Sequence, residues 1–346
     1  MTDIKSLTFE ELNSALTALG QPKFRANQIY KWLHKTGVSS FDEMTDLSKE
    51  LRSRLSEEYF IPYPVIEDKY VSKLDGTVKY LFKLFDGEYV EAVIMKYKYG
   101  YTICISTQVG CKMGCNFCAS TLAGFKRNLY SSELEGQIHA AQRDLGIRIS
   151  HVVLMGIGEP LDNYDNVISF FRFINDDKGI NISLRDVTVS TCGIVPKIYS
   201  LIEEKLPVTL TVSLHAPNDK IRSSMMPIND KWGVDEVIKA CKAYAEKTSR
   251  RVSFEYTLIS GVNDSEECAK ELARKLHGFI AHVNLIPVND VKERDYVKSG
   301  EKAINNFQFA LKSYGINATI RRTLGSDINA SCGQLRRRKN ENILNS

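Results

Sequence analysis

The chain has 346 residues, of which 43% are hydrophobic and 25% charged, and its net charge is +4. This length predicts two domains, or one large barrel with an appendage, and the composition excludes a globally disordered chain. The first twenty residues hold three acidic side chains and no apolar run, and no apolar stretch reaches the roughly 18 residues of a membrane span. We therefore expect a cytoplasmic protein, and the mild charge by itself gives no argument for nucleic-acid binding.

Residues 1–60 predict a small helical domain, because apolar residues recur at helical spacing and Gly20 is a signal for the end of a helix. Residues 61–96 follow a different pattern. Apolar and polar residues alternate over residues 77–85 and again over residues 89–95, with an Asp-Gly turn signal between them. This pattern predicts a β-hairpin that extends the helical domain toward the rest of the chain.

Residues 97–346 alternate strand-like and helical patterns. The strand-like runs are residues 101–107, 151–155, 186–190, 208–214, 252–257, 282–286 and 318–322. The intervening helices have start signals, with Ser132 and Glu135 predicting one capping box and Asp264 and Glu267 another. We expect an α/β fold of parallel βα units, too few for a complete eightfold barrel and therefore a partial (β/α)6-type barrel.

Residues with reactive or polar side chains follow most of these strands directly. Active sites of βα barrels are assembled at the carboxyl ends of their strands. The residues in question are Cys111, Cys115, Cys118, Gly158, Glu159, Ser190, Ser213, His215, Asn289 and Cys332. We expect one site at this rim.

Cys111, Cys115 and Cys118 form a C-x3-C-x2-C motif among polar residues. Such closely spaced thiolates hold metal centres. Zinc would need a fourth ligand, which the neighbouring sequence does not offer, whereas a [4Fe–4S] cluster on three thiolates keeps one iron open. The alternative, three cysteines packed as small apolar side chains, is disfavoured by the polar neighbours.

The motif, with Phe117 before its last cysteine, resembles the radical S-adenosylmethionine (SAM) superfamily. Further blocks resemble the RlmN/Cfr family of ribosomal RNA adenine methyltransferases over essentially the whole chain. These blocks are Gln108-Val-Gly-Cys111, Gly124-Phe-Lys-Arg-Asn-Leu129, Gly158-Glu-Pro-Leu161, Ser213-Leu-His-Ala-Pro217, Met226-Pro-Ile-Asn229 and Cys332-Gly-Gln-Leu335. Pro160 resembles the RlmN branch, which implies methylation of C2 of adenine 2503 in 23S rRNA and of adenine 37 in tRNA.

The resemblance implies roles for three residues beyond the cluster ligands. Cys332 would carry the methyl group as S-methylcysteine, and two SAM molecules would be used per turnover, one as methyl donor and one as radical source. Cys104 would release the RNA from the enzyme by forming a disulfide with Cys332, and Glu91 would be the proton acceptor. Without the resemblance, Cys104 is a typical buried thiol, whereas the polar neighbours of Cys332 argue against that interpretation for it. Glu91 is equally well an edge-strand charge facing water.

The resemblance also implies SAM contacts at Gly158, Glu159, Ser190, Ser213, Leu214, His215 and Asn289. Taken singly, each polar residue among them could equally be a satisfied strand-end side chain. Cys192, Cys241 and Cys268 are interpreted as structural thiols.

RNA contacts are expected from the N-terminal domain and from local basic groups. These groups are Lys126-Arg127, Arg250-Arg251, Arg321-Arg322, Arg336-Arg337-Arg338-Lys339 and the Lys96-Tyr-Lys-Tyr-Gly-Tyr101 run. We expect a monomer that receives electrons from a donor such as flavodoxin or ferredoxin. Two alternatives stay open: a Cfr-type enzyme that methylates C8, and a non-catalytic RNA-binding protein stabilised by zinc.

Overall fold

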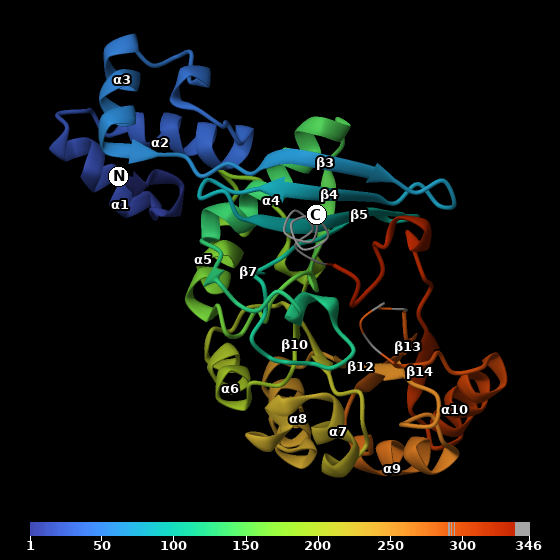
Figure 1. Ribbon diagram of the computed structural model, residues 1–346. Coiled ribbons are helices and arrows are strands. Elements are labelled where there is room, and N and C mark those ends of the chain that lie inside the picture. The colour runs from blue at the N-terminus through green and yellow to red at the C-terminus, as the bar shows by residue number, and fades with distance from the viewer. Residues whose placement is uncertain (290, 292, 294, 336–346) are drawn as a thin grey trace.

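The computed structural model describes residues 1–289, 291, 293 and 295–335 (Figure 1). The expected basic run at residues 336–339 lies outside the described residues. Within them, no helix has the length and apolar character needed to cross a membrane.

The N-terminal 60 residues form the expected helices around a core of their own. The elements are β1 (Thr2–Asp3), α1 (Phe9–Ala18), α2 (Phe24–Lys31), α3 (Lys49–Glu58) and β2 (Tyr59–Phe60). Thr8 and Glu11 close a capping box at the start of α1, and Ser48 caps α3. Because β1 pairs with β2 in parallel, the two ends of this segment lie together. Figure 1 shows these helices set to one side of the main sheet.

A ten-stranded sheet organises the rest of the described chain, in the order β14-β13-β12-β11-β10-β9-β6-β5-β4-β3. Its strands are β3 (Val65–Val71), β4 (Val78–Lys83), β5 (Tyr89–Tyr97), β6 (Gly100–Cys104), β9 (Ile149–Leu154), β10 (Val187–Thr191), β11 (Thr209–Ser213), β12 (Val252–Leu258), β13 (Ala281–Pro287) and β14 (Asn317–Ile320). Within this sheet the seven strands β6 and β9 to β14 run parallel. Strands β3, β4 and β5 extend the sheet in antiparallel fashion. The expected partial barrel with a hairpin extension is thereby confirmed, and β3 is an additional strand.

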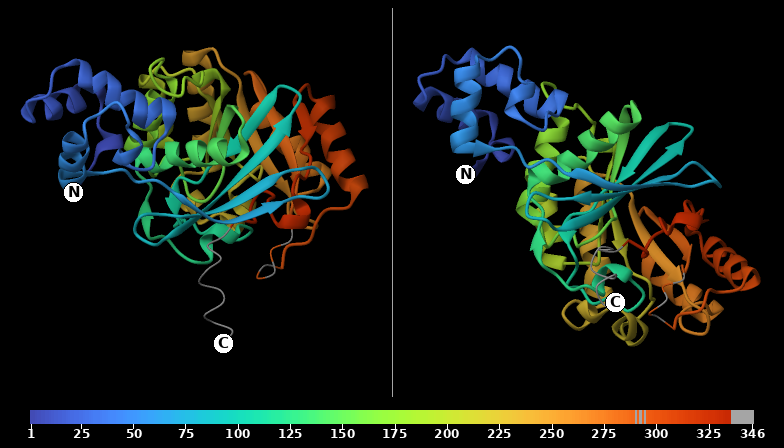
Figure 2. Two further views of the ribbon diagram at one scale, coloured as in Figure 1. Left: turned by 90° about the horizontal axis from the view of Figure 1, so that it is seen from above. Right: turned by 45° about the horizontal axis from the view of Figure 1, so that its top comes forward.

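Helices follow the parallel strands and pack on the outer side of the curved sheet (Figures 1 and 2). They are α4 (Ser131–Leu145), α5 (Tyr164–Asn175), α6 (Val195–Glu203), α7 (Asp219–Met225), α8 (Val234–Thr248), α9 (Glu266–Leu276) and α10 (Glu301–Ser313). Cys241 on α8 and Cys268 on α9 are buried in this layer, as expected of structural thiols. The helices cover the outer face, so the inner face and the strand ends are left for the site.

Both capping boxes predicted in the barrel are wrong. Helix α4 begins two residues earlier, where the Glu133 carboxylate accepts the Tyr130 N–H at 2.9 Å. Helix α9 is capped by Ser265, since the Asp264 carboxylate instead accepts from Ser299 at 2.7 Å. At α9 the neighbouring Ser265 thus takes the capping position, whereas at α4 the cap is Tyr130 and the carboxylate of Glu133 supplies the bond.

Glu135, released from capping, is fully buried where α4 meets the N-terminal helices. Its carboxylate lies 3.5 Å from Lys5 Nζ, 2.9 Å from His34 Nδ1 and 3.1 Å from His139 Nε2. Burial opposes ionisation, yet Lys5 and His34 hold the pKa of Glu135 well below its usual range. This charged cluster joins the N-terminal helices to the barrel.

Candidate functional site

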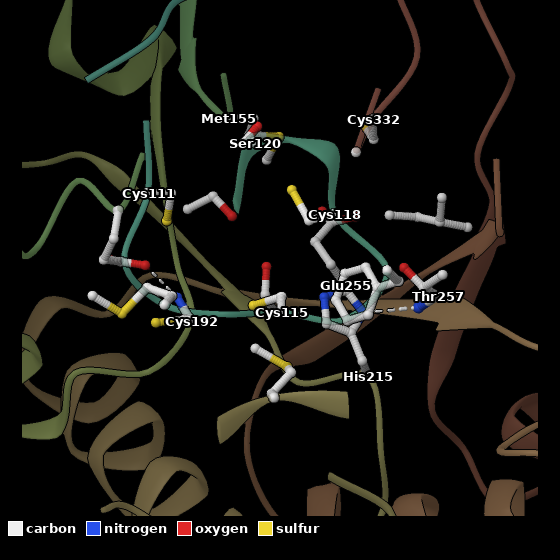
Figure 3. Close-up of a pocket in the computed structure, with 18 of the residues that line it drawn as sticks. Cys111, Cys115, Cys118, Ser120, Met155, Cys192, His215, Glu255, Thr257 and Cys332 are labelled. Carbon is white, nitrogen blue, oxygen red and sulfur yellow. Dashed lines mark hydrogen bonds between the residues drawn. The ribbon is translucent and has the colours of Figure 1, made fainter. Parts of the chain in front are cut away.

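The principal cavity opens at the carboxyl ends of the parallel strands (Figure 3). Its wall includes nine of the expected rim residues, which come from separate loops and strand ends: Cys111, Cys115, Cys118, Gly158, Glu159, Ser190, Ser213, His215 and Asn289. Cys332 completes it from beyond the last strand. The structure therefore places these ten residues around one cavity.

The loop that carries the three cysteines is shaped by glycine. Gly110 has φ +78°, and a Cβ at that position would lie 1.7 Å from the carbonyl oxygen of Gly124, so no other residue fits without displacing the backbone. Burial raises the pKa of Cys111 to about 12 and that of Cys115 well above its usual value, and nearby Cys118 adds to both. A metal centre that displaces the thiol protons would relieve this cost.

The three thiols fit an iron–sulfur cluster better than a single ion. Zinc requires four close ligands around one centre. Three cysteine sulfurs spread around a cavity are the donor set of a larger iron–sulfur cluster with one iron left open.

A tight turn after β9 places Gly158 and Glu159 opposite this loop. Gly158 has φ +105°, and a Cβ there would lie 2.6 Å from Cβ of Gln108. The Glu159 carboxylate accepts the N–H groups of Leu161 at 3.0 Å and Cys192 at 2.7 Å, while burial raises its pKa. The carboxylate is therefore fixed in orientation by the backbone around it.

His215 is a neutral hydrogen-bond donor facing the cavity. Its Nδ1 accepts the Thr257 N–H at 2.9 Å, and burial together with the charge of Arg222 lowers its pKa to about 3. Because Nδ1 is the acceptor in a neutral ring, Nε2 carries the proton. The ring meets Phe117 edge-on, with centroids 4.8 Å apart. Leu214, also expected at the site, is fully buried and is not part of the cavity wall.

Arg222 of α7 was missed by the sequence analysis, yet it fixes two of the strand ends. Its guanidinium is fully buried and donates to the carbonyl oxygens of Cys192 at 2.5 Å, Leu214 at 3.1 Å and Ser213 at 3.3 Å. An arginine on a short amphipathic helix carries no local signal for such a role, because its acceptors are distant in sequence.

Cys332 is exposed and lines this cavity, where Figure 3 labels it, as well as a second, smaller cavity. Its carbonyl oxygen accepts from Asn289 Nδ2 at 3.0 Å, and the next carbonyl, of Gly333, accepts the Ala119 N–H at 2.8 Å. Ser120 Oγ donates to the carbonyl of Leu335 at 2.9 Å. The Cys332 segment is thus bonded to the cysteine-rich loop, which brings thiols from opposite ends of the barrel together.

Cys104 lines the second, smaller cavity together with Cys332. Burial raises its pKa to about 12, with a smaller contribution from Cys332. All eight cysteines are free thiols, so the disulfide between Cys104 and Cys332 is not formed in this structure. The two thiols nevertheless share one wall.

Arg321, at the end of β14, lies in both cavity walls. Its guanidinium is 3.0 Å from the Glu255 carboxylate and donates to Met155 Sδ at 3.4 Å. The Cys332 sulfur, more than any other group, raises the pKa of Arg321. A fixed cation therefore faces both Cys104 and Cys332.

Glu91 is fully buried on β5, a strand flanked by β4 and β6. The alternative interpretation of an edge-strand charge facing water is therefore wrong, because β3 and β4 cover that side. Its carboxylate lies 3.4 Å from Lys79 Nζ. Glu91 is absent from both cavity walls, although Val93 and Met95 on the same face of β5 line the second one.

Comparisons with known proteins agree with this architecture. Residues 2–61 match the family described as Ribosomal RNA large subunit methyltransferase N-terminal domain, and residues 105–273 match the Radical SAM superfamily. A solved structure titled a radical SAM methyltransferase from Sphaerobacter thermophilus superposes with TM-score 0.92 at 42% identity, covering 97% of this chain and 99% of that one. Fold and thiol loop together define a radical SAM methyltransferase.

Two relatives identify the family within this class of methyltransferases. Both are named "Probable dual-specificity RNA methyltransferase RlmN". The protein from Lachnoclostridium phytofermentans is 56% identical, over 97% of this chain and 94% of the relative. The protein from Lachnospira eligens is 54% identical, over 99% of this chain and 98% of the relative. The chain belongs to the RlmN family.

Proposed function

We propose that this enzyme methylates C2 of adenine 2503 in 23S rRNA and of adenine 37 in tRNA. Support comes from family membership and from the RNA substrates in the relatives' names. The observation that carries the proposal is the position of Cys332, which borders both the cavity of the three-thiol loop and the cavity of Cys104. A methyl carrier has to meet both the radical source and the thiol that frees the product.

C2 of adenine is not a nucleophile, so a direct displacement on the sulfonium of SAM is not open to it. We infer that Cys332 first takes the methyl group: a bond forms between its sulfur and the methyl carbon, and the electron pair of the broken bond stays on the sulfur of SAM. Arg321 lies with Cys332 in the walls of both cavities, so its guanidinium is close to the sulfur that takes the methyl group.

Cys111, Cys115 and Cys118 would hold a [4Fe–4S] cluster. When bound, the cluster would supply the electron that cleaves a second SAM to a 5′-deoxyadenosyl radical and would take one electron back after methyl transfer. That radical removes hydrogen from methylated Cys332, whose methylene then adds to C2. The protein and the RNA are then covalently joined.

Release is assigned to Cys104 and Glu91. Cys104 attacks the Cys332 sulfur and forms a disulfide, which a reductant opens afterwards, and Glu91 accepts the proton from C2. Cys104 shares a cavity wall with Cys332, and Glu91 points from β5 on the face that borders that cavity.

The second SAM is proposed to lie across the strand ends. Neutral His215 offers an Nε2–H donor, the Ser190 and Ser213 hydroxyls face the same cavity, and Leu214 would contribute only its backbone. Gly158 lets the backbone beside Glu159 approach the ligand closely. Asn289 would contact SAM while holding the carbonyl of Cys332.

We propose three functional units: residues 1–60 as an RNA-binding domain, 61–96 as the hairpin extension and 97–346 as the catalytic barrel. Arg127 is not available for RNA, since its guanidinium binds the carboxylates of Asp86 and Glu133. Exposed Tyr99, stacked on Tyr97 with centroids 5.0 Å apart, offers a base-stacking surface beside Lys98. A flavodoxin- or ferredoxin-type donor and a monomeric state complete the proposal.

The test is methylation of 23S rRNA and tRNA by anaerobically reconstituted enzyme, followed by mass spectrometry of the nucleosides. We expect 2-methyladenosine and about four irons per chain. Exclusive 8-methyladenosine would establish the Cfr-type alternative. Stoichiometric zinc without iron or methylated product would establish a non-catalytic RNA-binding protein.

A further inference from the structure

Lys79 on β4 is a buried lysine that the proposed chemistry leaves without a role. Its side chain is 1% exposed. Lysine is almost never buried to this extent unless it is paired, because the ammonium group loses its hydration. Its position in the hairpin, far in sequence from the cysteines, gives no hint of a place near the site.

The Lys79 ammonium joins two segments that the proposed release step needs. It lies 3.4 Å from the Glu91 carboxylate and donates to the carbonyl oxygen of Asn329 at 3.2 Å. In the β4–β5 register Lys79 is opposite Val93, and Glu91 is opposite Leu81, so the two charges are diagonal neighbours on one face of the sheet. Val93 on that face lines the cavity of Cys104 and Cys332.

Asn329 belongs to the loop that leads into Cys332. The same loop is bonded twice more to the turn between β3 and β4: the Asp75 carboxylate accepts the Gly325 N–H at 2.9 Å, and the Asp327 carboxylate accepts the Lys73 N–H at 2.9 Å. Those two contacts lie at the rim. Lys79 is the contact that reaches from the loop to Glu91.

We propose that Lys79 is a positioning residue for product release, and this inference rests on the proposed function. Its ammonium pairs with the Glu91 carboxylate and donates to the Cys332 loop at Asn329, so the proton acceptor and the methyl carrier keep a fixed separation. It touches neither substrate nor cofactor.

Lys79 supports the release step, in which the RNA leaves Cys332. The C2 proton passes to the Glu91 carboxylate, and the electron pair of the C2–H bond stays in the purine. The Cys104 thiol gives up its proton and its sulfur bonds to Cys332 sulfur. The electron pair of the broken sulfur–carbon bond goes with the methylene carbon, which takes up one proton and so balances the one that Cys104 released. The one remaining electron would be taken up by the [4Fe–4S] cluster that Cys111, Cys115 and Cys118 would hold. Lys79 offsets the charge of Glu91 until its proton arrives.

The experiment compares reconstituted full-length variants in single turnover with 23S rRNA. It measures S-methylation of Cys332, 5′-deoxyadenosine and 2-methyladenosine. For Lys79→Met we expect Cys332 methylation within twofold of the wild type, but at least a tenfold rise in 5′-deoxyadenosine formed per methyladenosine. Lys79→Arg, which keeps the charge, restores most of the coupling. The double variant Lys79→Met/Glu91→Gln shows no further loss beyond the single variants, since both act on one step.

Lys83→Met is the matched control, because Lys83 lies on the same strand but is exposed. If Lys79 had a merely structural role, Lys79→Met would lower 5′-deoxyadenosine and 2-methyladenosine together and leave their ratio unchanged. That result would overturn the assignment. An equal rise of the ratio in Lys83→Met would overturn it as well. Lys79→Gln, which keeps a donor for Asn329, replaces Lys79→Met if the latter fails to retain iron. If the wild-type enzyme yields 5′-deoxyadenosine but no 2-methyladenosine, the proposed function and this inference are both overturned. If the wild type yields both products and Lys79→Met yields them in the same ratio, only the inference is overturned.

Discussion

Cys104 and Cys332 share a cavity, yet one thiol is buried and the other is exposed. Only the exposed one can first meet a methyl donor in the larger cavity. In Cys104→Ala, methylation of Cys332 and its addition to RNA should therefore proceed, while release falls at least tenfold. Denaturing gel electrophoresis with labelled RNA would show a covalent protein–RNA band that requires Cys332. Cys241→Ala, on the outer helices, should show none, and a missing band despite 5′-deoxyadenosine formation would contradict the scheme.

His215 sets an expected pH dependence of stability. Its pKa is about 3 in the folded protein and about 6.5 in an unfolded chain, so the unfolded chain binds more protons between these values. The stabilisation is complete above pH 6.5 and is lost as the pH falls toward 3, by about 1.4 kcal/mol per pH unit. Urea unfolding at pH 7, 6, 5 and 4 should show this extra slope in wild type and not in His215→Asn. Equal slopes would contradict the assignment of a neutral, buried ring.

At the scale of elements, α7 holds the ends of β10 and β11 through Arg222. Removing its guanidinium leaves several buried carbonyl oxygens without a donor. Arg222→Met should lower the free energy of unfolding by about 3 kcal/mol. Arg172→Met on α5, where the side chain is 65% exposed, should change it by less than about 0.5 kcal/mol. A similar small effect for both would show that water replaces the guanidinium.

The parallel strands were predictable from sequence because buried strands are apolar segments, and the helices between them have recognisable start and stop signals. Strand β3 was not, since its charged residues at the sheet edge do not alternate clearly. The placement of Cys111, Cys115 and Cys118 followed from spacing. The contacts of Arg222, Lys79 and Arg321 depend on partners far along the chain, which no local pattern records.

At the scale of the whole molecule, the described residues form two main cores, one in the N-terminal helices and one in the barrel. The charged cluster around Glu135 joins them. Glu135→Leu would leave the Lys5 ammonium buried without its counter-charge and should destabilise the protein by about 3–5 kcal/mol. Urea unfolding, with proteolysis near residue 62 as a second readout, would measure this.

The double variant Lys5→Met/Glu135→Leu is the matched control. Since it removes both charges, we expect it to recover most of the lost stability. If the double variant were as unstable as Glu135→Leu, the two histidines rather than Lys5 would be the partners that matter.

The loop that carries Cys332 is bonded to the hairpin, to Asn289 and to the cysteine-rich loop. During synthesis the three cluster ligands leave the ribosome well before Cys332 does. In the proposed scheme, a chain that ends before Cys332 has no thiol to carry the methyl group. Such an unfinished chain could not form the covalent link to RNA.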